Sequence, residues 1–197
     1  MKPRLLDLFC GAGGAAMGYH RAGFEVVGVD IKPQPHFPFE FHQADALIYP
    51  LEGFDAYHAS PPCQAYSRMR HLPWLKNRVY PMLIDSTRER LSSTGKPWVL
   101  ENVMDAHLPG GWLCGTMFGL PFYRHRVFET SFFWFQPGHP KHTFVIKPGR
   151  YFGDAGDRAN KLESVCWDWM SKMEQRQAIP PAYTEYIGLH LMEAVNA

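Results

Sequence analysis

The stretch that decides the fold is Leu5–Gly14, which reads L-L-D-L-F-C-G-A-G-G. Its first half is a short apolar run, typical of a buried strand, and its second half is rich in glycine. Glycines at such a point allow the backbone to approach a ligand closely and open a helix N-terminus toward it. The stretch therefore predicts a strand, a ligand-binding turn and a helix, in that order.

The same alternation continues along the chain and predicts an α/β fold with a mostly parallel sheet. Strands are predicted at Arg4–Phe9, Phe24–Val29, Phe54–Ala59, Trp98–Leu100 and Arg126–Phe135, and helices at Gly13–Ala22, Arg78–Ser92, Lys161–Gln175 and Ala182–Val195. Two segments are predicted to be irregular, Ile31–Phe41 and the loop Gln136–Asn160. Ligands bind such sheets beyond the carboxyl ends of the strands, where three candidate site segments fall.

Composition sets the broad class. The chain has 197 residues, of which 46% are hydrophobic, and this suits one globular domain with a core of its own. Because there is no long apolar run and no signal-peptide pattern, we expect a cytoplasmic protein that does not contact a membrane. The net charge of +1 means that a nucleic-acid partner would need a local basic face. The four cysteines form no C-x-x-C pair and no Cys/His cluster, so neither a metal site nor a disulfide framework is expected.

The glycine-rich turn is compatible with two cofactors. Gly11-x-Gly13-x-x-Ala16 satisfies a loose dinucleotide fingerprint. Asp30, at the end of the second predicted strand, is placed to accept hydrogen bonds from a ribose diol. That arrangement suits NAD and S-adenosylmethionine equally, and a purely structural turn capped by an acid is the less favoured alternative for this segment alone.

A cysteine on a stiff loop separates these interpretations. Ser60–Gln64 reads S-P-P-C-Q, and the two prolines restrict the backbone just beyond a predicted strand. A free cysteine is usually a small buried hydrophobe, but the prolines and the polar Gln64 argue against that role for Cys63. Hydride transfer needs no such thiol, whereas nucleophilic catalysis does, with the thiolate as the reacting form.

Two further segments carry charged residues suited to catalysis. Glu101 ends an apolar run, and a carboxyl in a cleft tends to have a raised pKa that suits proton donation. Arg124 and Arg126 share one side of an extended segment and could together hold a carbonyl oxygen or a phosphate. Each segment alone has an ordinary alternative. Glu101 could be an exposed acid, and Arg124 and Arg126 could lie on a solvated strand face.

In chain order these segments resemble the C5-cytosine DNA methyltransferase family. D-L-F-C-G-A-G-G resembles the S-adenosylmethionine loop of that family, and P-P-C-Q resembles its catalytic cysteine loop. Glu101-Asn102-Val103 is similar to the E-N-V motif, and Arg124-His125-Arg126 to the R-x-R of Q-x-R-x-R. Ile179–Gly188, which reads I-P-P-A-Y-T-E-Y-I-G, resembles the last motif, whose helix packs by the cofactor site.

The resemblance implies a Rossmann-like S-adenosylmethionine-dependent methyltransferase fold with helices on both faces of the sheet, in one catalytic domain over residues 1–197. It implies transfer of a methyl group from S-adenosylmethionine to C5 of a flipped cytosine in double-stranded DNA. Cys63 would add to C6, Glu101 would bind N3 and the exocyclic amine, and Arg126 with Arg124 would bind O2 and the phosphate. The implied cofactor-binding residues are Phe9, Cys10, Gly11, Ala12, Gly13, Gly14, Asp30, Ile31, Asp45, Ala46 and Pro62.

Three departures from the family pattern affect target recognition and one cofactor contact. Phe122 stands in place of the usual Gln, and Arg176-Gln177-Ala178-Ile179 replaces the usual G-N-A-V. A loop or hairpin over residues 130–160 stands in place of a recognition domain. The short region indicates a compact phage or mobile-element enzyme that protects DNA from restriction, in a bacterial or phage-infected cytoplasm. It also raises the expectation of a protein partner for target recognition, with the chain a monomer or weak dimer.

Basic residues in two clusters are candidates for phosphate contacts. They are Arg68, Arg70, His71, Lys76 and Arg78 after the cysteine loop, and Lys141, His142, Lys147 and Arg150 in the late loop.

Three alternatives to a DNA methyltransferase stay open. The same chemistry could act on RNA, or an idle S-adenosylmethionine-binding module could act with a partner. An NAD oxidoreductase is third, because it leaves P-P-C-Q and E-N-V without a role.

Overall fold

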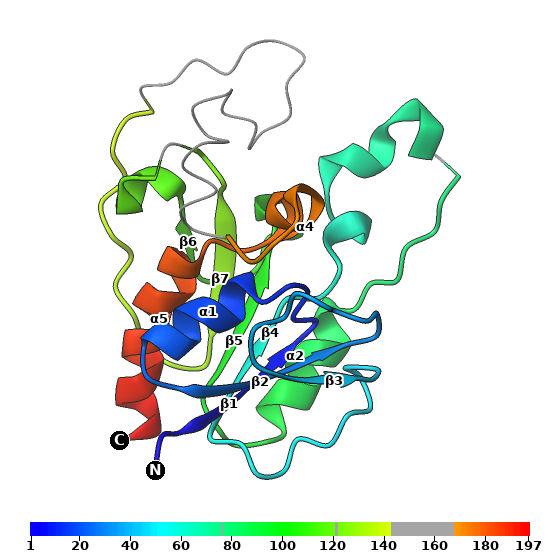
Figure 1. The fold of residues 1–197 in the computed structure, drawn as a ribbon. Coiled ribbons are helices and arrows are strands. Elements are labelled where there is room, and N and C mark those ends of the chain that lie inside the picture. The colour runs from blue at the N-terminus through cyan, green and yellow to red at the C-terminus, as the bar shows by residue number, and fades with distance from the viewer. Residues whose placement is uncertain (76, 121, 143–167) are drawn as a thin grey trace.

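The computed structural model describes residues 1–75, 77–120, 122–142 and 168–197, and these build one twisted sheet covered by helices (Figure 1). The strands are β1 Arg4–Leu8, β2 Glu25–Asp30, β3 Glu40–Gln43, β4 Ala56–Ala59, β5 Trp98–Asn102, β6 Gly111–Leu113 and β7 Arg126–Thr130. The α-helices are α1 Gly14–Arg21, α2 Ile84–Ser92, α4 Lys172–Gln177 and α5 Pro181–Val195. Short 3-10 turns cover Cys63–Ala65, Arg68–His71, Pro73–Leu75, Met104–Ala106 and Gly115–Phe118.

The strand order is β3-β2-β1-β4-β5-β7-β6. Strands β1 to β5 run parallel, whereas β7 is antiparallel to both of its neighbours, β5 and β6. From β1 the chain proceeds to β2 and β3 on one side and then returns to place β4 on the other side. The boundary between β1 and β4 is therefore the topological switch point, where open α/β sheets bind ligands. This architecture confirms the predicted Rossmann-like α/β fold with a mostly parallel sheet.

Helices cover both faces of the sheet, as the sequence predicts. On one face α1 and α5 pack together, with the fully buried Tyr19 and Tyr183 in the core (Figure 1). On the other face α2 contributes the fully buried Leu91. The α1–α5 contact is so close that a Cβ on Gly18 would lie 2.1 Å from the hydroxyl oxygen of Thr184. None of the helices in the described ranges has the length and apolar character needed to cross a lipid bilayer.

The observed elements differ from the predicted ones at places with identifiable causes. The predicted helix Arg78–Ser92 begins only at Ile84, and Pro81 accounts for the loss of its first residues, because it disfavours helical backbone at Tyr80. The stretch predicted to be irregular ends in β3, a mostly exposed edge strand without an apolar alternation. The strand predicted at Trp98–Leu100 continues to Asn102, and the one predicted at Arg126–Phe135 ends at Thr130. The strand β6 was not predicted.

The C-terminal half of the chain is described only in part. Of the predicted loop Gln136–Asn160, residues 143–160 lie outside the described residues, and so do residues 161–167 of the predicted helix Lys161–Gln175. Helix α4 overlaps the end of that prediction, and a capping box joins Ser171 and Glu174 at its start. The predicted helix Ala182–Val195 is confirmed as α5, with Pro181 in its first turn.

A buried carboxyl group lies on the central strand. Asp7 of β1 is fully buried and pairs in register with Gly28 and His58. Burial raises its pKa well above the ordinary value for an aspartate, and the negative charge of Asp30 raises it further. Asp7 therefore retains its proton in the folded state at pH values where the unfolded chain has released it.

Asp7→Asn should change the pH dependence of stability. The contribution of Asp7 is fully present below the unfolded pKa, about 4, and decreases as the pH rises toward the raised pKa of the folded state. Over that window the free energy of unfolding of Asp7→Asn should rise relative to the wild type by about 1.4 kcal/mol per pH unit. Urea unfolding from pH 5 to 8 measures this difference. The exposed Asp168 supplies a control, Asp168→Asn. If the difference in the free energy of unfolding from the wild type did not change with pH for either variant, the assignment would be contradicted.

Candidate active site

The glycine-rich turn connects β1 to α1 at the switch point. Its backbone turns sharply, because Phe9, Gly11 and Gly13 all have positive φ angles, of 59°, 50° and 86°. The two glycines serve different purposes. A Cβ on Gly13 would lie 2.8 Å from the Pro38 ring, so Gly13 permits packing, whereas a Cβ on Gly11 would meet no atom within 4 Å. The open space beside the turn therefore lies at Gly11.

Asp30, at the end of β2, holds the turn from the neighbouring strand. Its carboxylate accepts hydrogen bonds from the Gly11 N–H at 3.1 Å and from the Lys32 N–H at 2.9 Å. The Asp45 carboxylate accepts a bond from the Leu47 N–H at 2.9 Å, in the turn that follows β3. The predicted cofactor residues that follow β1, β2 and β3 thus lie at the same carboxyl edge of the sheet (Figure 1).

Trp169 closes the other side of the turn, far along the chain. Its indole N–H donates to the Ala12 carbonyl oxygen at 2.9 Å, and Ala12 packs in a small apolar cluster with Phe122 and Met170. Phe122, which stands in place of the Gln of the family motif, is almost completely buried. It serves as a core residue beneath the turn.

The cysteine loop leaves the sheet at the end of β4, directly beside the glycine-rich turn. The Ser60 N–H donates to the Leu8 carbonyl oxygen at 3.2 Å, which joins the starts of the two loops. The Asn102 side-chain amide donates to the Pro61 carbonyl oxygen at 2.9 Å and fixes the loop against β5. Cys63 begins the first 3-10 turn and is half-buried. The thiol thus faces neither bulk solvent nor a closed core.

Glu101 and Arg126 form an ion pair next to this thiol. Glu101 Oε1 and Arg126 Nε are 3.0 Å apart, and both side chains are largely buried. Burial raises the pKa of Glu101, although Arg126 and the Ser60 hydroxyl counteract the rise. Burial also raises the pKa of the Cys63 thiol, the positive charge of Arg126 lowers it, and the charge of Glu101 raises it. The charges of all three groups are therefore coupled.

A buried chain of hydrogen bonds leads from α1 to Glu101. The Tyr19 hydroxyl lies 2.8 Å from His58 Nδ1, and His58 Nε2 lies 2.7 Å from the Ser60 hydroxyl oxygen. Burial lowers the pKa of His58 to about 3, so the imidazole is neutral and carries one N–H. One consistent arrangement has Tyr19 donating to His58, His58 donating to Ser60 and Ser60 donating to Glu101. Tyr19 and His58 were not predicted as site residues, since only the fold brings them to Glu101.

Arg124 occupies a different environment from Arg126. Its guanidinium Nη1 donates to the carbonyl oxygens of Gln175 and Ala178, at 2.8 and 2.7 Å, at the end of α4. The Tyr183 hydroxyl in turn donates to the Arg124 carbonyl oxygen at 2.6 Å. Arg124 therefore anchors the C-terminal helices, and the structure brings Arg126 rather than Arg124 to Glu101.

The segment that follows the cysteine loop reaches outward from the carboxyl edge of the sheet (Figure 1). It exposes Arg68, Arg70, His71 and Arg78, together with the indole of Trp74. Arg68 donates to the Asp105 carboxylate at 2.7 Å. Three of the predicted basic residues, Lys76, Lys147 and Arg150, lie outside the described residues.

The remaining predicted cofactor residues also follow the carboxyl ends of strands β1 to β4. Ile31, just past β2, is 65% exposed, whereas Cys10 and Ala46 are buried and Pro62 is half-buried. Burial raises the pKa of Cys10 far above the ordinary value of a thiol, so this cysteine remains protonated. Of the cysteines in the described residues, Cys63 is the one that is not fully buried, and the charges of Arg126 and Glu101 act on its thiol.

Comparison with known proteins gives only distant matches. No family model matches the chain, and no curated protein matches it by sequence. One similar solved structure is described as a DNA modification methyltransferase encoded within a prophage of E. coli, at 20% identity and a TM-score of 0.49, over 64% of this chain and 45% of that one. Another is the S. pombe Dnmt2 methyltransferase, at 17% identity and a TM-score of 0.45, over 66% and 49%. A third is a hypothetical protein of Thermus thermophilus, at 18% identity and a TM-score of 0.42, over 66% and 74%. The chain thus spans less than half of each of the first two structures.

Ser60→Ala should raise the pKa of Glu101. The Ser60 hydroxyl stabilises the ionised carboxylate, and a hydrogen bond to a charged group contributes about 1.5–3 kcal/mol. Its removal should therefore move the titration of Glu101 upward by about one to two pH units. Carbon NMR of the side-chain carboxyl measures the change, with Glu101→Gln identifying the signal. Ser92→Ala, on the exposed end of α2, is the control. The same titration in both variants would show that Ser60 does not act on Glu101.

Proposed function

We propose that this chain is an S-adenosylmethionine-dependent DNA methyltransferase that methylates C5 of cytosine through a covalent bond to Cys63. The observation that carries the proposal is the coupling of Cys63, Glu101 and Arg126 at the switch point, beside the glycine-rich turn. A thiol, a buried acid and a guanidinium are the groups that addition to a cytosine ring requires. An NAD-dependent reaction would leave this constellation without a role.

Each of the three groups has a chemical task. C5 of cytosine is a poor nucleophile, and addition of the Cys63 thiolate to C6 makes C5 electron-rich. Arg126 favours the thiolate electrostatically, and the raised pKa of Glu101 keeps a proton available for N3 of the ring. Loss of the C5 proton and departure of the Cys63 sulfur then restore the aromatic ring. The target base must be flipped out of the duplex, which costs a few kcal/mol.

The residues around the turn fit S-adenosylmethionine. The open space at Gly11 leaves room for a ligand against the backbone, and the exposed side chain of Ile31 offers an apolar surface for an adenine ring. Asp30 lies between them, where its carboxylate can accept hydrogen bonds from ribose hydroxyls. The bound cofactor supplies the methyl group that C5 accepts. Asp45 and Pro62 complete the proposed set at the same edge.

The outward-reaching segment supports a nucleic-acid substrate. Arg68 and Arg70 place guanidinium groups next to the cysteine loop, and phosphate contacts by such groups dominate nucleic-acid affinity. Double-stranded DNA is the proposed substrate. RNA is the second candidate, and one observation favours it: the indole of Trp74, 68% exposed beside these arginines, could stack on an unpaired base.

Cys63→Ala should abolish covalent adduct formation. With cofactor and DNA that contains 5-fluorocytosine, the C5 substituent cannot leave as a proton, so a wild-type protein–DNA adduct should accumulate. The adduct is detected by denaturing electrophoresis and its site by peptide mass spectrometry. An adduct that persists in Cys63→Ala would contradict the proposed nucleophile.

Cofactor binding distinguishes a lost nucleophile from a lost fold. Cys63→Ala should bind S-adenosylmethionine as the wild type does in calorimetry. Asp30→Asn should weaken that binding by about 1–3 kcal/mol, because it removes a charged acceptor. Asp55→Asn is the matched control, since Asp55 lies at the opposite, amino end of β4, where it accepts a bond from the Arg4 N–H. Binding of NAD without binding of S-adenosylmethionine would refute the proposal.

A further inference from the structure

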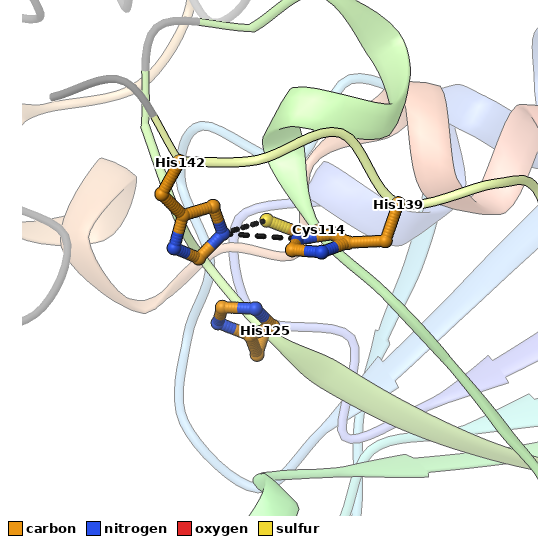
Figure 2. Close-up of side chains that lie close together, drawn as sticks. All are labelled: Cys114, His125, His139 and His142. Atoms are coloured by element: carbon orange, nitrogen blue, oxygen red, sulfur yellow. Dashed lines mark hydrogen bonds between the residues drawn. The ribbon is translucent and has the colours of Figure 1, made fainter.

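Four potential metal ligands meet on the side of the sheet formed by β6 and β7. Cys114 follows β6, His125 directly precedes β7, and His139 and His142 lie on the segment that follows β7. One ligand atom of each residue lies within 4.8 Å of those of the other three. Figure 2 shows the three imidazoles and the thiol converging from separate segments. Because these residues are spread over positions 114–142, their sequence pattern led to the expectation of no metal site.

The spacing of these atoms is close to that of a tetrahedral metal centre. His142 Nε2 lies 3.4 Å from Cys114 Sγ and 3.0 Å from His139 Nε2 (Figure 2). In a tetrahedral zinc site, metal–ligand bonds of about 2.0–2.3 Å place neighbouring ligand atoms roughly 3.3–3.6 Å apart. Only small side-chain movements are needed to place a cation at the same distance from all four atoms.

The chemistry of the donor set selects zinc. Thiolate and imidazole together suit Zn²⁺, whereas Mg²⁺ and Ca²⁺ prefer oxygen ligands, and the group contains no carboxylate. Four protein ligands would fill a tetrahedral shell, which is typical of a structural site rather than a catalytic one. Cys114 is buried, whereas His139 and His142 are exposed, so a cation can reach the group from solvent.

Neighbouring rings hold the imidazoles in place. The Tyr123 ring stacks on His142 with a centroid distance of 3.7 Å and an interplanar angle of 12°. Trp112 contacts both His125 and His139, with centroid distances of 5.3 and 4.9 Å. Such outer contacts orient the ligands of a metal site and reduce the cost of ordering them when the ion binds.

We propose that Cys114, His125, His139 and His142 bind one Zn²⁺ ion as a structural site. The ion joins the segment after β7 to the β6–β7 pair. It also fixes His125, the direct neighbour of Arg126, and so supports the orientation of that guanidinium next to Glu101. His142 is then a metal ligand instead of the phosphate contact that the sequence indicates. Zinc binding itself does not depend on the proposed methyl transfer.

The test is the zinc content of the untagged protein after exposure to Zn²⁺ and removal of unbound ions by gel filtration. Elemental analysis should give about one zinc per chain. His139→Ala/His142→Ala should lower the content below about one tenth, since two of four ligands are lost. Both residues are exposed, so the fold should persist, which circular dichroism checks. The control His20→Ala/His71→Ala removes two exposed histidines elsewhere and should leave the content unchanged.

Cobalt tests the thiolate ligand. Co²⁺ in place of zinc should give visible absorption of a tetrahedral centre and a sulfur-to-metal charge-transfer band, and Cys114→Ser should lose that band. A wild-type zinc content below about one tenth per chain would overturn the proposal. Equal zinc in the wild type and His139→Ala/His142→Ala would also overturn it. Full zinc binding in a protein without methyl transfer would refute the proposed function alone.

Discussion

Strands β1 and β4 lie side by side and parallel, although β2 and β3 separate them in the sequence. This pairing is the constraint on which the remainder of the site depends. It makes the chain reverse direction across the sheet, so the loops that leave the two strands diverge at the switch point, where open α/β sheets bind ligands. The hydrogen bond from Ser60 to Leu8 joins them where they begin to diverge. The glycine-rich turn and the cysteine loop are adjacent for this reason alone.

The strands next to this pair explain why an acid can be buried at the same edge of the sheet. Strand β5 lies next to β4 and carries Glu101, and a buried carboxylate is stable only with charged or hydrogen-bonding partners. Arg126 comes from the antiparallel β7, and Ser60 from the end of β4. These partners only partly offset the effect of burial, so the pKa of Glu101 stays raised. A carboxyl of this kind suits a proton donor more than a permanent anion.

Local signals predicted the parts of the site that lie on single segments. Glycines after an apolar strand identify the turn, and two prolines before Cys63 identify a stiff loop, because each restricts the backbone by itself. Contacts between distant segments were beyond sequence reasoning. Arg124 was grouped with Arg126, yet β7 begins only at Arg126, so the two side chains do not share a strand face. His58 reads as one polar residue in a buried strand, and only the fold brings the Tyr19 hydroxyl of α1 to its imidazole. The exposed edge strand β3 lacks the alternation by which strands are recognised.

The central claim is that the residues at the switch point between β1 and β4 transfer a methyl group to carbon 5 of cytosine. The most direct measurement is incubation of the protein with S-adenosylmethionine carrying a deuterated methyl group, in parallel with duplex DNA and with structured RNA. Both substrates are then digested to nucleosides and analysed by mass spectrometry. The account predicts labelled 5-methyl-2′-deoxycytidine from the DNA, and its absence in a parallel reaction with Cys63→Ala. Label on adenine, on the amino group of cytosine, or on no nucleoside at all would contradict the account, and label in RNA alone would identify RNA as the substrate.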